Sequence, residues 1–195
     1  KKINGLLGKN FQNFKREIID DLNALPFPDW SSIPLNNYWK LKHAHGPLSA
    51  NKYVSILTSR GCPYPCKFCI IPETNDRKWR FRSAKNVVDE IETLINEYNI
   101  KEFHLEDLNP TINEKRTVEL CNEIIKRKLK INWKIVAGTK VESIKREETI
   151  NLMAESGCKY IAIAPESGST RIMKAMGKPF NIDHAYKIVK QMNKN

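Results

Sequence analysis

From residue 51 onward, the pattern of hydrophobic and polar positions defines two kinds of segment that alternate along the chain. Short runs rich in β-branched and aromatic residues predict buried strands. Longer segments, with apolar residues three and four positions apart, predict helices that rest one face on a sheet. The predicted strands are 53–58, 101–106, 132–137 and 159–164, and the predicted helices are 84–99, 112–129, 146–156 and a last one marked by Ile182, Ala185, Tyr186, Val189 and Met192.

Two of these helices carry boundary signals. Thr111 followed by Glu114 resembles a capping box at the start of the second helix. Gly157 follows the third helix and suits the left-handed backbone position at which helices commonly end. Both signals agree with the boundaries that the apolar spacing predicts.

Four strand–helix units in tandem predict parallel strands joined by right-handed crossovers. The fold class is therefore α/β, and the architecture is a partial (βα) TIM-like barrel. We expect the last strand to have an uncovered edge, which is an aggregation hazard. Residues 1–50 lack a sustained period and contain several prolines, so they predict an extended connector whose aromatic residues pack on a neighbour.

Composition sets the broad class of protein. Hydrophobic residues make up 41% and charged residues 28%, and no uncharged apolar run approaches the length of a membrane span, so we expect a cytoplasmic protein. The net charge of +11 is compatible with an anionic partner such as RNA. Solvated lysine-rich helices also explain the charge. The basic run 126–130, for example, closes a predicted helix, where cations offset the helix dipole, and we favour this second explanation.

Three cysteines, Cys62, Cys66 and Cys69, follow the first predicted strand directly. Three thiolates on one short loop can hold three corners of a 4Fe-4S cluster and leave the fourth iron without a protein ligand. Gly61 and the prolines within the loop restrict its backbone, so its sulfurs are presented in one geometry. The carboxyl end of a strand is also where ligands bind in α/β sheets and barrels.

Other uses of the cysteines are less consistent with the pattern. A zinc site completed by His43 or His45 is an alternative, but structural zinc normally uses two short cysteine pairs, and the second pair is absent. A disulfide framework is disfavoured because the chain has five cysteines, an odd number. We expect Cys121 and Cys158 to be small buried apolar residues.

Several other reaction classes find no support in the sequence. The histidines, including His104 and His184, have no spacing that indicates chemistry, and each is expected to be a neutral core or surface residue. No Ser-His-Asp set, phosphate-binding loop or EF-hand pattern is present, so neither hydrolysis nor nucleotide-triphosphate chemistry is indicated.

The cysteine segment, with its lead-in Thr58–Tyr64 and an aromatic residue before the last cysteine, resembles the signature of radical S-adenosylmethionine enzymes. More narrowly, it is similar to the branch that carries a cobalamin-binding domain upstream. Three further segments occur in the order and spacing of that branch, so the resemblance extends from about residue 20 to the end; they are Trp79–Ser83, Glu102–Asp107 and Ile163–Ser169.

This resemblance implies a domain arrangement. Residues 1–50 would be the linker from an N-terminal cobalamin domain that the chain does not contain, and its Asp-x-His-x-x-Gly signature is absent. Residues 51–195 would form four of the six units of a radical S-adenosylmethionine barrel.

The resemblance also implies a reaction. The open iron chelates the amino and carboxylate groups of S-adenosylmethionine, and one electron cleaves this cofactor to methionine and a 5′-deoxyadenosyl radical that abstracts hydrogen. Methylation or ring closure with cobalamin would be the usual outcome. A small-molecule or peptide substrate and an electron donor such as flavodoxin or ferredoxin are the implied partners. Modification of tRNA, and a non-catalytic iron-sulfur or zinc module, are the alternatives.

Further site residues are expected where the other strands end. Glu106 and Asp107 are placed to bind the cofactor ammonium, and Glu166 with Ser167 lies in a turn that resembles one facing the cofactor in this branch. Arg171 is a possible partner of the cofactor carboxylate and Phe68 of its adenine. The alternatives are a solvated strand end for the two acids, a surface arginine, and a Phe68 that only shields the cluster. The predicted metal ligands are Cys62, Cys66 and Cys69, and the predicted cofactor-binding residues are Phe68, Glu106, Asp107, Glu166, Ser167 and Arg171.

Overall fold

A parallel four-stranded sheet is the centre of the computed structural model, which describes residues 5, 7–9, 11–12, 17–178 and 180–194. The strand order is β3-β6-β7-β8, and each neighbouring pair is parallel. This arrangement confirms the α/β class and the partial barrel. The strands are β3 (Tyr53–Ile56), β6 (Glu102–Leu105), β7 (Asn132–Thr139) and β8 (Cys158–Ile163).

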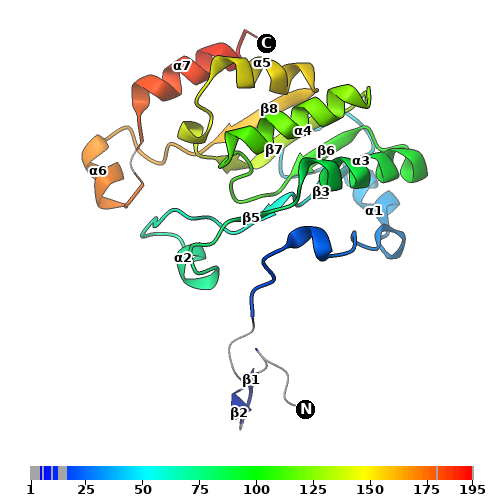
Figure 1. Cartoon of the computed structure of the whole chain (residues 1–195), viewed down its shortest axis with the longest axis horizontal. Helices are drawn as coiled ribbons and strands as arrows, with labels where there is room; N and C mark the ends of the chain where they lie inside the picture. The colour runs from blue at the N-terminus through cyan, green and yellow to red at the C-terminus, as the bar shows by residue number, and fades with distance from the viewer. Residues whose placement is uncertain (1–4, 6, 10, 13–16, 179, 195) are drawn as a thin grey trace.

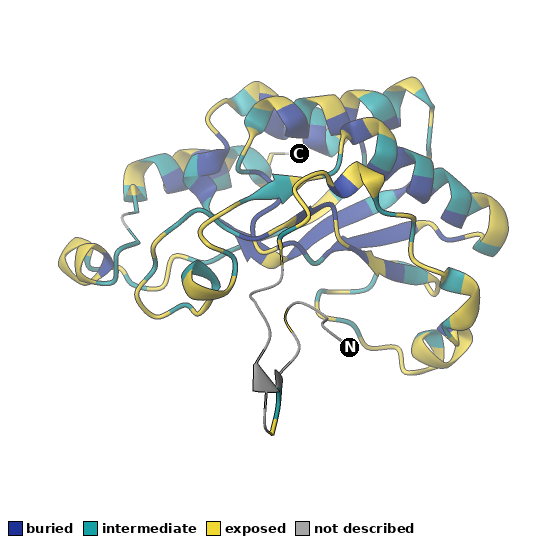
Figure 2. Ribbon diagram, turned by 60° about the horizontal axis from the view of Figure 1, so that its bottom comes forward, coloured by how far each residue is buried: buried dark blue, intermediate teal, exposed yellow. Residues whose placement is uncertain are grey.

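Four helices lie in one layer over this sheet (Figure 1). They present the apolar stripe that the sequence predicts, and the side of each helix toward the sheet is buried (Figure 2). Val88, Leu94 and the facing strand residue Phe103 are all fully buried. The helices are α3 (Ala84–Tyr98), α4 (Glu114–Lys126), α5 (Glu147–Glu155) and α7 (Ile182–Met192).

The second helix begins differently from its prediction. Asn113 is the N-cap, because its side chain accepts a hydrogen bond from the Arg116 amide at 3.2 Å. Glu114 instead accepts hydrogen bonds from the amides of Lys145 and Arg146, in the turn before α5. The prediction of a capping box with Thr111 was therefore wrong, because the Glu114 side chain makes a long-range contact instead.

The chain also contains short elements that the apolar periodicity does not reveal. An antiparallel ladder joins β4 to β5 on either side of the cysteine segment. Each of these elements has six residues or fewer, too short to show a period. They are β4 (Ser59–Arg60), β5 (Arg80–Phe81), α2 (Ile71–Thr74), the 3-10 turn η3 (Val141–Ser143) and α6 (Thr170–Ala175).

The first fifty residues are not extended throughout. The described part includes β1 (Leu7–Gly8), β2 (Phe11–Gln12), the 3-10 turns η1 (Leu22–Ala24) and η2 (Trp30–Ser32), and α1 (Leu35–Lys40). The predicted aromatic anchors are confirmed, because the indole of Trp30 donates to Glu90 at 2.9 Å and that of Trp39 donates to the Tyr53 carbonyl at 2.8 Å. Residues 1–4, 6, 10 and 13–16 of this region lie outside the described part.

The face of the sheet away from the helices is polar and buried. Glu102, His104 and Lys134 are each at most 2% exposed, and one Glu102 oxygen lies 2.8 Å from both His104 Nε2 and Lys134 Nζ. Ser49 donates to the second Glu102 oxygen through its amide at 2.9 Å and through its hydroxyl at 2.5 Å. The connector therefore crosses this face. It passes so close that a Cβ on Gly46 would lie 2.5 Å from Val136 Cγ1.

The expectation of an uncovered edge concerns β8. This strand ends the sheet order and, within the part of the chain that the structure describes, pairs only with β7. Tyr160 on this strand is 38% exposed. A cavity of about 420 Å³ lies between β8, α5 and α7, lined by Met153, Ile161 and Met192 among others. The edge is thus open, as predicted.

Replacing Lys134 by methionine should destabilise the fold strongly. The variant leaves the buried Glu102 carboxylate without its cation, and removal of one partner from a buried ion pair costs about 3–5 kcal/mol. Urea unfolding near neutral pH measures the loss. Lys101→Met, which removes an exposed charge from the adjacent connection, is the matched control and should change stability little.

Acid should remove the same contribution in the native protein. Burial opposes the charge of Glu102, but hydrogen bonds from Lys134, Ser49 and His104 outweigh it and hold the Glu102 pKa below its ordinary 4.5. The stabilisation is therefore present above pH 4.5 and is lost as the pH falls further. A Lys134→Met protein with unchanged unfolding free energy, or with an unaltered acid limb, would show that the pair is not stabilising.

Candidate functional site

The backbone is tightly restricted where the cysteine loop, residues 61–69, begins. Gly61 has φ +82°, and a Cβ there would lie 2.0 Å from the Lys78 carbonyl oxygen, so only glycine fits. The β4–β5 ladder pairs Ser59 with Phe81 and Arg60 with Arg80, which closes the excursion that contains the loop. The loop is thus anchored at both ends.

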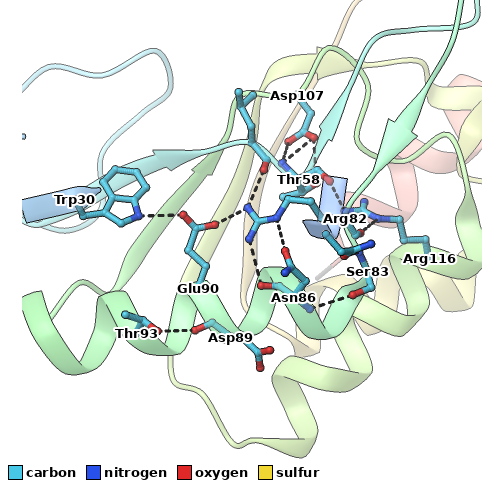
Figure 3. Close-up of polar contacts among 12 residues, drawn as sticks. Trp30, Thr58, Arg82, Ser83, Asn86, Asp89, Glu90, Thr93, Asp107 and Arg116 are labelled. Atoms are coloured by element: carbon cyan, nitrogen blue, oxygen red, sulfur yellow. Dashed lines mark hydrogen bonds and ion pairs between the residues drawn. The ribbon is translucent and has the colours of Figure 1, made fainter. Parts of the chain in front are cut away.

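A buried hydrogen-bond network fixes the strand end that leads into this loop (Figure 3). Asp107, which is 0% exposed, accepts from the Thr58 amide at 3.0 Å and from the Ser59 hydroxyl at 2.5 Å. Arg116, 2% exposed, donates to the Thr58 carbonyl at 2.8 Å and to the Arg82 carbonyl at 2.9 Å. Burial raises the pKa of Asp107, while the hydrogen bonds from Ser59 and Thr58 and the charge of Arg116 oppose that rise.

Asp107 was predicted to contact the cofactor, and in the structure its carboxylate is fully buried. Its carboxylate points into the protein, and the hydrogen bonds around it end on Thr58 and Ser59. These hydrogen bonds hold the end of the chain segment from which the cysteine loop begins. The preceding residue, Glu106, is on the opposite side of the chain, as neighbours along an extended segment are.

Glu106 lies at the accessible polar rim of the sheet. Its side chain is 26% exposed, with Oε2 at 2.8 Å from His45 Nδ1 and Oε1 at 3.3 Å from the Ser55 hydroxyl. A ligand ammonium can reach this carboxylate, in contrast to that of Asp107. His45 was expected to have no special role, and the sequence offered no spacing that pairs it with Glu106.

The three thiols are partly exposed and share one local environment. The Cys69 amide donates to the Cys66 carbonyl at 3.1 Å. Burial raises the pKa of Cys62 and of Cys66, and neighbouring cysteines contribute to both increases, so the sulfurs are close enough to interact electrostatically. The charge of Lys178 opposes both increases.

The chemistry of this donor set fits an iron-sulfur cluster better than a single metal ion. Within the described ranges, no three His, Cys, Asp or Glu side chains converge to hold one ion, including any set with His43 or His45. In a 4Fe-4S cluster each cysteine binds a different iron, so the three sulfurs need not converge on one point.

The turn after β8 lies near the cysteine loop. Glu166 adopts φ +62°, a left-handed conformation, and its Oε1 lies 2.6 Å from Lys178 Nζ. The Lys178 ammonium is also 5.9 Å from the Phe68 ring centroid, so it links two of the predicted cofactor residues. Ser167 accepts a hydrogen bond from the Ser169 amide at 3.1 Å. Arg171 is exposed on α6.

Lys178 is the functional candidate that the sequence analysis missed. It is separated from the cysteines by more than one hundred residues and belongs to no recognised spacing. The only local signal is Gly177, which ends α6 with φ +69° and turns the next residue back toward the loop. A glycine at this position predicts a turn, but it does not predict that the turn lies against the cysteine loop.

The remaining cysteines and histidines have structural environments. Cys121 is fully buried in α4, where burial raises its pKa to about 11, and Cys158 packs against the core. His104 is fully buried beside Glu102, and His184 Nε2 lies 2.8 Å from the Ile144 carbonyl. The burial expected for Cys121 is therefore confirmed, whereas Cys158 is only partly buried. In the described part of the chain, no helix has the length and apolar character needed to cross a membrane.

Comparison with known proteins identifies the family. The model of the "Radical SAM superfamily" matches residues 56–195, well over half of the chain. A cytidylyl-2-hydroxyethylphosphonate methyltransferase of Streptomyces wedmorensis is 34% identical over 87% of this chain and 32% of its own length. An anaerobic magnesium-protoporphyrin IX monomethyl ester cyclase of Rubrivivax gelatinosus is 32% identical over 91% of this chain and 30% of its own length. The chain thus spans about a third of the length of these relatives.

Solved structures agree on the fold. The cobalamin-dependent S-adenosylmethionine radical enzyme OxsB, with aqua-cobalamin bound, superimposes with a TM-score of 0.67 at 22% identity, over 92% of this chain and 26% of that one. The sequence match and the four-stranded parallel sheet lead to the same conclusion. The chain belongs to the radical S-adenosylmethionine superfamily, whose members use a 4Fe-4S cluster and S-adenosylmethionine.

Proposed function

We propose that Cys62, Cys66 and Cys69 hold the 4Fe-4S cluster and leave its fourth iron open to S-adenosylmethionine. When bound, the cluster supplies the electron that cleaves this cofactor to methionine and a 5′-deoxyadenosyl radical. The observation that supports the proposal most directly is the anchoring of the cysteine loop. Gly61 and the β4–β5 ladder hold three interacting thiols at the carboxyl end of the parallel sheet.

The cofactor is proposed to contact residues around this loop. Glu106 and Glu166 are partly exposed carboxylates at two strand ends, suited to an ammonium group. Phe68 is 54% exposed on the loop itself, so its ring is accessible to adenine. Arg171 is accessible for the cofactor carboxylate, and the turn at Ser167 permits backbone contact.

For the whole protein we propose a cobalamin-dependent methylation or cyclisation. The relatives carry the names of a methyltransferase and a cyclase, and OxsB is named as cobalamin-dependent. Residues 1–50 would then link a cobalamin domain to the barrel of residues 51–195. A small-molecule or peptide substrate, a flavodoxin or ferredoxin donor and a cytoplasmic location complete the proposal.

Modification of tRNA is a weaker candidate that the net charge of +11 favours. Arg127, in the basic run 126–130, is not free to bind a phosphate, because it lies 2.8–2.9 Å from carboxylate oxygens of Asp89, Glu92 and Glu123. A nucleic-acid partner predicts an affinity that falls steeply with salt. Binding of tRNA with no salt dependence would argue against it.

Anaerobic reconstitution with iron and sulfide tests the cluster. We expect the reduced protein to give a 4Fe-4S electron paramagnetic resonance signal that shifts when S-adenosylmethionine is added. Cys66→Ala should lose the signal because one corner of the cluster has no ligand. Cys158→Ala, the same change outside the loop, should retain it. A cluster indifferent to the cofactor, or stoichiometric zinc instead of iron, would favour a non-catalytic metal module.

Asp107→Asn separates positioning from cofactor binding. Asparagine keeps one acceptor oxygen, but its NH2 group cannot accept from the Thr58 amide, which also donates to Asp107 Oδ2 at 3.1 Å, and the charge beside buried Arg116 is lost. We therefore expect a loss of roughly 1–3 kcal/mol of unfolding free energy. Cluster retention should fall with it. Denaturant unfolding and iron content measure the two effects, with exposed Asp183→Asn as control. Weaker S-adenosylmethionine binding in a variant of full stability and iron content would instead assign Asp107 to the cofactor.

A further inference from the structure

The end of helix α6 is packed against the cysteine loop. The Lys67 amide donates to the Met176 carbonyl at 2.9 Å. Gly177 follows with φ +69°, and a Cβ there would lie 2.9 Å from the Pro65 carbonyl oxygen, so this close approach favours glycine. These backbone contacts fix the position of the main chain at the next residue, Lys178.

Lys178 extends from this contact to the turn after β8. Its ammonium donates to the Ala164 carbonyl at 2.7 Å and to Glu166 Oε1 at 2.6 Å. The side chain is only 11% exposed. Two fixed acceptors and low exposure distinguish it from a surface lysine whose ammonium moves freely in water. It is a positive charge held in one place.

This charge lies beside the cysteine loop. The Lys178 ammonium is 5.9 Å from the ring centroid of Phe68, and Phe68 stands in the chain between Cys66 and Cys69. A second cation, Lys140, lies 5.1 Å from the ring centroid of Tyr64 on the same loop, but its ammonium is paired with a carboxylate oxygen of Glu142 at 3.1 Å.

We propose that Lys178 is a positioning residue that raises the reduction potential of the cluster and orients Glu166 beside it. The inference rests on the proposed function of the three cysteines. Reduction adds one negative charge to the cluster, and a nearby fixed cation stabilises the reduced form more than the oxidised form. The step is a single-electron transfer from a chemical reductant such as dithionite. No bond forms or breaks, and no proton moves.

A potentiometric titration of the reconstituted protein, followed by electron paramagnetic resonance, tests this role. Lys178→Met should lower the ratio of reduced to oxidised cluster at a fixed potential by roughly tenfold, a midpoint shift of about 59 mV for one electron. Lys178→Arg keeps the charge and should stay near the native potential. Lys174→Met removes an exposed charge from α6, four residues before Lys178, and should leave the potential unchanged.

Glu166→Gln provides a second variant of opposite sign. Removing the counter-charge leaves Lys178 unneutralised, so the midpoint should rise. If Lys178→Met takes up no cluster, Glu166→Gln decides the question, because an unchanged potential there overturns the proposal.

The outcomes also separate this inference from the proposed function. An intact native cluster that responds to S-adenosylmethionine, with equal potentials in the native protein and Lys178→Met, would overturn the role of Lys178 alone. Failure of the native protein to form a cluster, or a cluster indifferent to the cofactor, would overturn the proposed function itself.

Discussion

The backbone of Thr58 is the point on which the rest of the site depends. Its amide donates to Asp107 after β6, and its carbonyl accepts from the Arg116 guanidinium in α4 and from the Arg82 amide after β5. Two charged groups are thereby buried together, and loss of either would leave the other unpaired in a medium of low dielectric. The network therefore forms as a unit and fixes the position of Thr58, four residues before the first cysteine, Cys62.

The alternation at the end of β6 shows what sequence analysis can and cannot decide. Glu106 and Asp107 are adjacent acids at a strand end, and both were predicted to bind the cofactor. Consecutive residues point to opposite sides, so only one can face the rim. Which side is the rim depends on the connector, which covers the polar face through Ser49 and brings His45 to Glu106. The periodicity of apolar positions in the sequence carries no information about that long-range contact.

The main strands and helices were predictable because they repeat a pattern over many residues. In α3, Val87, Val88, Ile91 and Leu94 define one buried stripe. The cysteine spacing was equally local. The wrong or missing predictions concern residues whose partners are distant in the sequence. Glu114 accepts a hydrogen bond from the turn before α5, and the end of α6 brings Lys178 to the cysteine loop. The two-residue strands β4 and β5 are too short for any periodicity.

Both accessible carboxylates of the rim are already paired, Glu106 with His45 and Glu166 with Lys178. The partners differ in a way that matters for binding. His45 is 55% exposed, so its contact with Glu106 is weak and a ligand ammonium can displace it at little cost. Lys178 is 11% exposed and held by a second acceptor, so it stays in place. The rim thus combines one exchangeable anion with one fixed ion pair, and the fixed pair is the one nearest the ring of Phe68.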